Sequence, residues 1–203
     1  MNRAGASTRP PGRPRSGVHA AVFAATLQTV DELGYARANV ERIAAAAGIA
    51  KTTIYRRWPS KGALIVDCLL DAFGPAPLEG ADPAEIMSST THWIASKIAE
   101  PGVGDAFAGV FSDGVSDPAL RRILSEKLQE PYRVALHDAL GEPDHRVLFY
   151  IDVVVGTLLH RLGMNGEPMT DADTVALAEM VMLYMTQDNG SARAETVSPA
   201  TDR

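Results

Sequence analysis

The chain has 203 residues, a formal net charge of −6 and 46% hydrophobic residues. That composition lies in the globular range and excludes a wholly disordered chain. The single cysteine, Cys68, excludes an internal disulfide framework and a multi-cysteine zinc site. The first twenty residues lack the apolar run of a secretory signal, and no stretch approaches the ~18 apolar residues of a membrane span. We therefore expect a soluble, cytoplasmic protein without a metal or other cofactor.

Positive charge is concentrated at the N-terminal end of the chain. Residues 1–61 contain ten basic and three acidic residues, a net charge of +7, whereas the remaining 142 residues have a net charge of −13. A basic end on an acidic body predicts a surface for a polyanion such as DNA, confined to that end.

The sequence predicts an all-α fold, because apolar residues recur at spacings of three and four and no useful length alternates with period two. Residues 1–16, with three prolines and four arginines, predict a flexible basic arm. Helices are expected over 17–33, 40–47, 51–58, 60–73, 82–100, 105–113, 118–140 and 144–164, and from Thr170 onward. Asn39, Ser60, Asp82-Pro83 and Asp117-Pro118 are the expected helix starts, and Pro131 is expected to bend its helix.

The domain boundaries follow from these elements. We expect a three-helix DNA-binding domain over 17–62, a larger helical domain for ligand binding and dimerisation over 63–188, and a disordered tail over 189–203.

The segment from Asn39 to Lys61 has the pattern of a helix-turn-helix. Two short helices flank Gly48, and glycine permits the tight turn between them. The apolar side chains of both helices are expected to form a small shared core: Ile43, Ala44, Ala47, Ile49, Ile54 and Trp58. The polar side chains of the second helix then remain outside: Lys51, Thr52, Thr53, Tyr55, Arg56 and Arg57.

This outer set offers hydrogen-bonding groups for base edges and cations for phosphates. The N-terminal end of the second helix normally enters the major groove first, so Lys51, Thr52 and Tyr55 are candidates for base contacts. A solvated polar helix face is the alternative. The lack of any acidic residue between Glu41 and Asp67 favours DNA binding.

The stretch NVERIAAAAGIAKTTIYRRWPSKGAL resembles the signature of TetR-type (TetR/AcrR) transcriptional regulators, and the likeness is dense over residues 17–70. The residues that carry it are Val40, Ile43, Ala44, Ala47-Gly48, Thr53-Ile54-Tyr55, Trp58, Ser60-Lys61 and Leu64. The resemblance implies that Thr53, Tyr55, Arg57 and Lys61 hold phosphates, while Lys51 and Thr52 face bases. Many relatives have threonine where this chain has Asn39, which can cap the helix but lacks the hydroxyl that would contact a phosphate.

The arm contains Gly12-Arg13-Pro14-Arg15, an extended and slim segment. Arg13 and Arg15 are candidates for insertion into a narrow minor groove, and phosphate attraction alone is an equally good interpretation.

The resemblance also implies a ligand pocket among the later helices. The candidate wall residues are Trp93, Phe107, Phe111, Tyr132 and Phe149, although aromatic residues at helical spacing are more often plain core. His92, His137, His145 and His160 are candidate polar groups of the pocket. Their spacing matches no metal-ligand motif.

Residues 144–164 are too apolar to bury one face only, so this helix and the last helix predict a homodimer seam. Internal core is the competing interpretation. A charge at Val154 or Leu158 is expected to weaken assembly if those side chains lie in the seam.

Two functions from different classes remain at this point. The first is a dimeric repressor that leaves a palindromic operator when a small, largely apolar effector binds. The second is a helical enzyme or carrier with an incidental basic end. No nucleophile elbow, phosphate-binding glycine loop or carboxylate pair supports catalysis, and an enzyme would not need the charge split.

Overall fold

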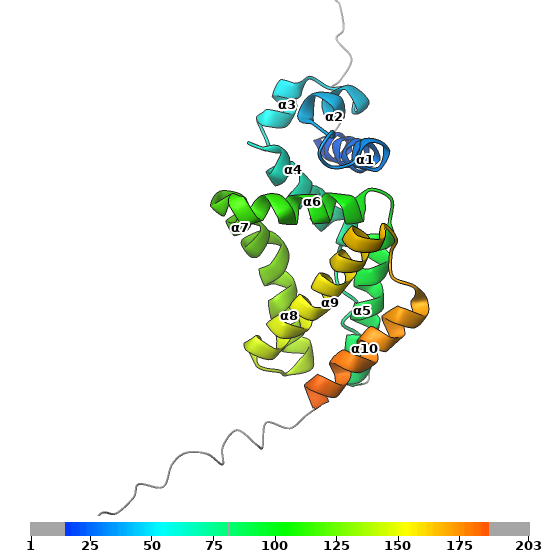
Figure 1. Ribbon diagram of the computed structural model, residues 1–203. Helices are drawn as coiled ribbons and strands as arrows, with labels where there is room; N and C mark the ends of the chain where they lie inside the picture. The colour runs from blue at the N-terminus through cyan, green and yellow to red at the C-terminus, as the bar shows by residue number, and fades with distance from the viewer. Residues whose placement is uncertain (1–14, 81, 187–203) are drawn as a thin grey trace, which may run out of the picture.

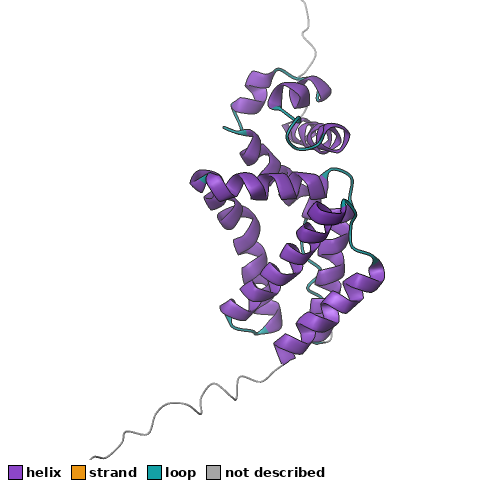
Figure 2. Cartoon of the chain, in the orientation of Figure 1, coloured by secondary structure: helices purple, strands orange, loops and turns teal. Residues whose placement is uncertain are grey.

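The computed structural model describes residues 15–80 and 82–186. Within these ranges every regular element is helical, and no strand is present (Figure 2). The elements in chain order are α1 (Arg15–Leu33), α2 (Val40–Ala46), α3 (Lys51–Tyr55), α4 (Lys61–Phe73), α5 (Pro83–Ala99), α6 (Val103–Ser116), α7 (Pro118–Ile123), η1 (Leu124–Gln129), α8 (Glu130–Leu140), α9 (Asp144–Asn165) and α10 (Asp171–Thr186). The all-α prediction is confirmed.

The expected capping residues start their helices. Asn39 Oδ1 accepts a hydrogen bond from the backbone N–H of Arg42, and Ser60 Oγ accepts one from Ala63. Asp82 and Asp117 cap α5 and α7 in the same way, each directly before a proline. These caps satisfy N–H groups that have no partner within the helix.

Some boundaries differ from the predicted ones. α1 begins at Arg15 rather than at 17, and α3 ends at Tyr55, three residues before Trp58. The single helix expected over 118–140 is α7, a π-helical segment η1, and α8. Pro131 explains the position of the irregularity, because its ring clashes with the carbonyl four residues earlier and it has no N–H for that carbonyl.

The molecule has a small head and a larger body (Figure 1). We call α1–α3 with the start of α4 the head, and α5–α10 with the rest of α4 the body. The head core consists of Val22, Val40, Ile43, Ala44, Ile54, Trp58, Ala63 and Leu64. Ala47 and Ile49 pack against this core but are only partly buried.

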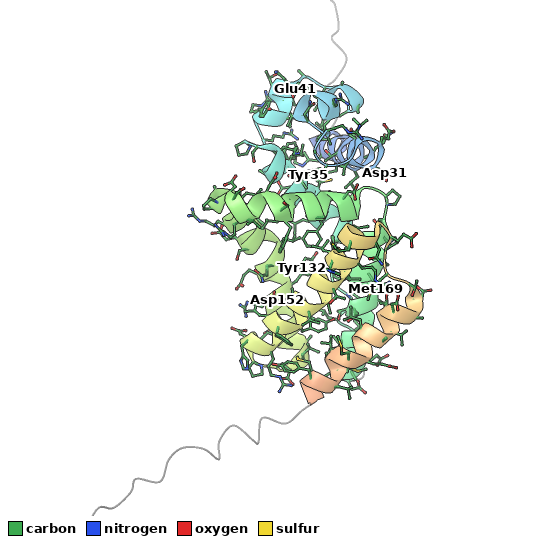
Figure 3. The ribbon with its side chains drawn as sticks, in the orientation of Figure 1. Asp31, Tyr35, Glu41, Tyr132, Asp152 and Met169 are labelled. Atoms are coloured by element: carbon green, nitrogen blue, oxygen red, sulfur yellow. The ribbon has the colours of Figure 1, made fainter. Side chains whose placement is uncertain are left out.

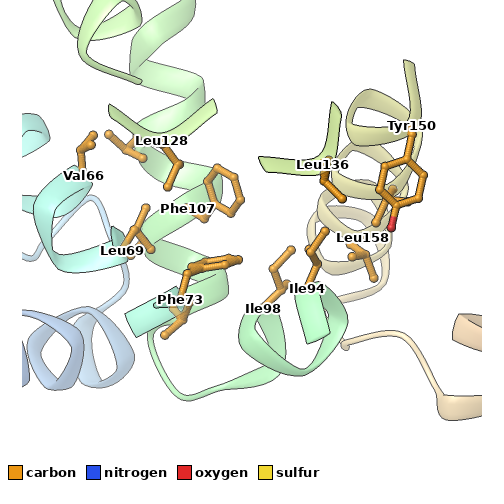
Figure 4. Packing of buried hydrophobic residues seen from close by; sticks show 14 of the residues in the cluster. Val66, Leu69, Phe73, Ile94, Ile98, Phe107, Leu128, Leu136, Tyr150 and Leu158 are labelled. Atoms are coloured by element: carbon orange, nitrogen blue, oxygen red, sulfur yellow. The ribbon is translucent and has the colours of Figure 1, made fainter. Parts of the chain in front are cut away.

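The helix α4 takes part in both cores. Ala63 and Leu64 belong to the head core, whereas Ile65, Val66 and Leu69 belong to the body core. Figure 4 shows Val66, Leu69 and Phe73 of α4 facing Phe107 and Leu128 of the body. The proposed domain boundary at 62/63 therefore falls inside a continuous helix.

Cys68 also lies on α4 and is 1% exposed. Burial, and secondarily the charge of Asp71, raises the pKa of its thiol to about 12. The side chain is thus a protonated core residue at neutral pH, as its apolar position in the sequence suggests.

The apolar helix α9 packs one face into the body. Val147, Tyr150, Val154 and Leu158 are at most 2% exposed within the protomer. This corrects the idea that Val154 and Leu158 test a dimer seam, because a charge there would be placed in the core of the body. The outward-facing residues of α9 and α10 are different ones and are described below.

Candidate DNA-binding surface and ligand cavity

The recognition segment, by which we mean residues 47–58 with the turn after α2, α3 and Trp58, lies at the end of the molecule opposite α10 (Figure 1). Residues 47–50 form the turn between α2 and α3, and Gly48 has a φ of +65° there. That backbone region suits glycine and strains most other residues. The turn places α3 across α2, with Ile54 fully buried beneath it.

The structure brings most of the predicted DNA-contacting side chains to one outer face. Lys51, Thr52, Tyr55 and Arg56 are exposed, while Thr53 and Arg57 are half-buried. Asn39 is exposed, and its side chain caps α2 by accepting a hydrogen bond from the backbone N–H of Arg42. Arg13 lies outside the described residues, and Arg15 is the first residue of α1.

Lys51 is held by an acidic neighbour in this state. Its Nζ lies 3.1 Å from Glu41 Oε1 on α2, and both side chains are more than half exposed. A hydrogen bond from its own backbone N–H, followed by the one from Lys51, holds the pKa of Glu41 below its ordinary value. Such an exposed pair is weak, so Lys51 can exchange this carboxylate for a base edge or a phosphate.

A polar recess lies next to the C-terminal end of α3. It is lined by His19, Arg56, Arg57, Trp58 and Asp67. The indole Nε1 of Trp58 donates a 2.8 Å hydrogen bond to Asp67 Oδ2 of α4. Arg57 Nη1 is buried in the structure without a hydrogen-bond partner among the described residues. A buried donor of this kind is suited to an anion that enters the recess.

Lys61 lies at the junction of head and body. Its Nζ donates a 3.0 Å hydrogen bond to the carbonyl oxygen of Tyr35 and sits 3.5 Å from the centroid of the Tyr35 ring. The Tyr35 hydroxyl donates a 2.5 Å hydrogen bond to Asp113 Oδ2 of α6. Figure 3 shows Tyr35 at the junction of the head with α6. Burial and then the Asp113 bond raise the pKa of Tyr35, and burial lowers the pKa of Lys61.

Gly109 of α6 makes this junction possible. A Cβ built on Gly109 would lie 2.0 Å from Cγ of the Tyr35 ring, so the ring rests directly on the helix backbone. We expect Gly109→Ala to lower the free energy of unfolding by about 1–3 kcal/mol, because the rigid ring must leave its position. Denaturant titration measures this change.

Gly163→Ala is the matched control, since a Cβ at this helical position would meet no other part of the described chain within 4 Å, apart from its own helix backbone and the two adjacent residues. It is expected to be neutral or slightly stabilising. Equal stabilities of the two variants would contradict the packing argument.

The body contains a partly open cavity of about 850 Å³ between α4–α8 and α9. Its wall is mostly aliphatic and aromatic. Phe107, Phe73, Trp93 and Tyr132, in that spatial order, form an aromatic cluster at the wall, with ring centroids of successive residues 5.5–5.8 Å apart. The Tyr132 hydroxyl donates a 2.6 Å hydrogen bond to the carbonyl of Gly74, which fixes that ring.

Polar side chains without hydrogen-bond partners among the described residues also line the cavity. Arg121, Ser125 and Gln129 follow one another at four-residue intervals along α7 and η1. Asp152 and His160 stand opposite on α9, two helical turns apart. An apolar space with a few free polar groups is the usual constitution of a small-molecule site.

Four of the five predicted aromatic wall residues line the cavity: Trp93, Phe107, Phe111 and Tyr132. Phe149 does not. It is 45% exposed, and its ring lies 4.7 Å from that of Tyr184 on the outer side of α9 and α10. Of the four candidate histidines only His160 lines the cavity; His92 and His137 hydrogen-bond to backbone carbonyls.

Sequence reasoning missed Phe73 as a wall residue, because the pocket was expected among helices later than the one over 60–73 that carries it. Asp152 and His160 carried a usable signal, because both interrupt an apolar helix at an eight-residue spacing. The Tyr35–Asp113 contact joins residues 78 positions apart and left no local pattern.

α9 and α10 expose several large apolar side chains, which we call together the apolar face of α9 and α10. Its members are Phe149, Met164, Val175, Met180, Leu183 and Tyr184, each 39–73% exposed.

Contrary to the expectation from the sequence, α9 is long and apolar enough to cross a membrane by length and composition, and 22% of its apolar window is buried. Among the described residues no cluster of histidine, cysteine or carboxylate side chains could hold a metal ion.

Comparison with known proteins assigns the chain to a family. The profile described as bacterial regulatory proteins, tetR family, matches residues 22–68. The DNA-binding transcriptional repressor TetR of Mycobacteroides abscessus is 31% identical over an alignment of 178 residues that covers 82% of this chain and 92% of that protein. The chain belongs to the TetR family. It is therefore a DNA-binding transcriptional regulator with a helix-turn-helix.

Other relatives agree with this TetR-family assignment. The uncharacterised regulator YdeS of Bacillus subtilis is 25% identical, with 79% of this chain and 86% of that protein covered. The fold is shared with FadR of Bacillus subtilis, solved with stearoyl-CoA, at a TM-score of 0.61, 22% identity and coverage of 82% and 97%. It is also shared with the flavonoid-responsive regulator FrrA, at a TM-score of 0.53, 20% identity and coverage of 83% and 95%.

Proposed function

We propose that this TetR-family protein is a homodimeric repressor that leaves a palindromic operator when a small, largely apolar ligand binds. The observation that carries the proposal is the cavity of about 850 Å³ in the body. Its volume lies within the ~300–1,000 Å³ of typical ligand sites. The apolar wall agrees in character with stearoyl-CoA and flavonoids, the compounds associated with two fold neighbours.

The head is proposed to bind DNA through the residues of the helix-turn-helix. Lys51 and Thr52 would read base edges, and Thr53, Tyr55, Arg56 and Arg57 would hold phosphates. Arg13 and Arg15 would add contacts at the adjacent backbone or minor groove. Asn39 would support the surface through its cap, and Lys61 would reach a phosphate only after leaving Tyr35.

The apolar face of α9 and α10 is proposed as the dimer seam. A large exposed apolar patch is unusual for a monomer, and a two-fold axis through it would form a four-helix packing. Two heads spaced about 34–36 Å apart would then fit successive major grooves of a palindromic site. We place this soluble dimer in the cytoplasm, where DNA is available.

The test begins with selection of bound fragments from random DNA, which supplies an operator. Thermal-shift screening of apolar metabolites and drugs then supplies a ligand. The ligand is expected to lower operator affinity about 5–150-fold, and operator DNA must weaken ligand binding by the same factor. A screen without a stabilising compound would refute the sensor function while leaving DNA binding intact.

A matched pair of variants locates the effect. Ala108 lines the cavity, so Ala108→Trp is expected to abolish ligand binding without loss of operator affinity. Ala119 is exposed on α7, and Ala119→Trp should bind the ligand normally. Retained ligand binding by Ala108→Trp would place the ligand elsewhere. An enzyme or carrier, the alternative function, would show neither operator selection nor steep salt dependence on heparin.

A further inference from the structure

A line of hydrogen bonds joins the cavity wall to the end of the recognition segment. Asp67 of α4 accepts the indole N–H of Trp58 at 2.8 Å through Oδ2. Its other oxygen, Oδ1, lies 2.8 Å from Nζ of Lys127 on η1. Asp67 is therefore bonded to the head and the body at once, one carboxylate oxygen to each.

The body end of this line lies on an unusual element. η1 is a π-helical segment of six residues, and π-turns are rare and concentrate at functional sites. Leu124, Ser125 and Leu128 line the cavity from η1, whereas Lys127 reaches Asp67 on α4. The same short segment thus presents one side to the cavity and the other to α4.

The packing around this line is continuous. Ile123, directly before η1, packs against both the head core and the body core. Leu120 of α7 lies against Gly62, where an added Cβ would approach its methyl groups to 2.8 Å. Movement of α7 and η1 therefore acts directly on α4 and on the base of the head.

We propose that Asp67 and Lys127 are positioning residues that transmit occupancy of the cavity to the recognition segment through Trp58. This inference rests on the proposed ligand function. A ligand that presses on Leu124 and Leu128 changes the register of the π-turn, and each residue of a helix is rotated about 100° from the last. Lys127 then loses Asp67, and Trp58 with the end of α3 is no longer held in the state shown.

The two tryptophans of the chain report on the two ends of this route. Trp93 lines the cavity, and Trp58 hydrogen-bonds to Asp67. The experiment follows both indole N–H resonances in ¹⁵N-labelled full-length protein during titration with N-phenylnaphthylamine, a neutral aromatic probe. The Trp58→Phe variant assigns the two signals. In the wild type both resonances are expected to move with the same dissociation constant.

In Lys127→Met the Trp93 resonance should still respond to the probe and the Trp58 response should be lost. Asp67→Asn should behave in the same way, because asparagine keeps an acceptor for the indole but not the charge that holds Lys127. Lys97→Met is the matched control, since it removes the 2.8 Å ion pair between Lys97 of α5 and Glu100, directly after that helix, away from the route. It should respond like the wild type.

The proposal is overturned if Trp58 responds in Lys127→Met as in the wild type. It is also overturned if Trp93 moves in the wild type and Trp58 does not. If the Trp93 resonance does not move during the titration of the wild type, the result counts against the proposed ligand function instead. In that event the probe-free spectra decide, because an unchanged Trp58 resonance in Lys127→Met would show that Lys127 has no influence on the head.

Discussion

Leu183→Asp is expected to convert the protein into monomers and to reduce operator affinity to the level of random DNA, a loss of about a thousandfold or more. Leu183 is 66% exposed in the protomer, so the substitution leaves the core of each protomer intact. In the proposed seam, the same position would place two carboxylates in an apolar interface. Light scattering at micromolar concentration measures the assembly, and operator titration measures the binding.

Val134→Asp is the control for this prediction. Val134 is 41% exposed on α8, outside the proposed seam, and its substitution should leave dimer and operator affinity unchanged. A dimeric Leu183→Asp protein would exclude α10 from the seam. Val154 and Leu158, by contrast, are buried in each protomer, so charges there would unfold the body without testing assembly.

Tyr55→Ala is expected to weaken binding to operator and to random DNA equally, by about one order of magnitude or more for a dimer that loses two phosphate contacts. Tyr55 is 45% exposed on α3 and contributes little to the head core, so fold and assembly should persist. Lys51→Ala should instead relax the preference for one base pair in each half-site, at about 1–3 kcal/mol. Fluorescence titrations with operator and random duplexes measure both.

Salt dependence separates the charged contributors in the same assay. The double variant Arg13→Ala, Arg15→Ala removes four cations from a dimer, and the slope of log affinity against log salt should fall by up to about four. Arg122→Ala, an exposed cation of α7 in the body, should leave the slope unchanged.

The phosphate assignment of Tyr55 and the base assignment of Lys51 would be exchanged by the opposite result. In that case Lys51→Ala would weaken binding to operator and random DNA equally, and Tyr55→Ala would relax the base preference.

The features that could be predicted from the sequence are the local ones. Asn39, Ser60, Asp82 and Asp117 start helices because a side-chain oxygen satisfies the first N–H groups, which requires only neighbouring residues. The helix-turn-helix followed in the same way, because Gly48 and the apolar spacing around it are local. Trp93, Phe107 and Tyr132 reached the cavity because helical periodicity points them inward, whereas Phe111 lines it while 55% exposed.

The features that escaped prediction depend on contacts between distant residues. Phe149 and Val154 are both apolar residues of α9, and only the packing of α5 and α10 decides which one faces outward. The junction of Lys61 with Tyr35 spans 26 positions, and the Lys127–Asp67 pair spans 60. The π-turn before Pro131 was expected only as a bend, because periodicity does not distinguish a kinked α-helix from one with an inserted residue.

The membership of α4 in both cores has a thermodynamic consequence. Without Ala63 and Leu64 the head core would lose one wall, and the rest of α4 is stabilised by the body. We therefore expect head and body to unfold as one cooperative unit. A ligand bound in the body cavity as proposed would stabilise head and body together by RT ln(1 + [L]/Kd), and would therefore raise the melting temperature of the head, which it does not touch. The thermal stability of the DNA-binding end would then depend on the concentration of that ligand.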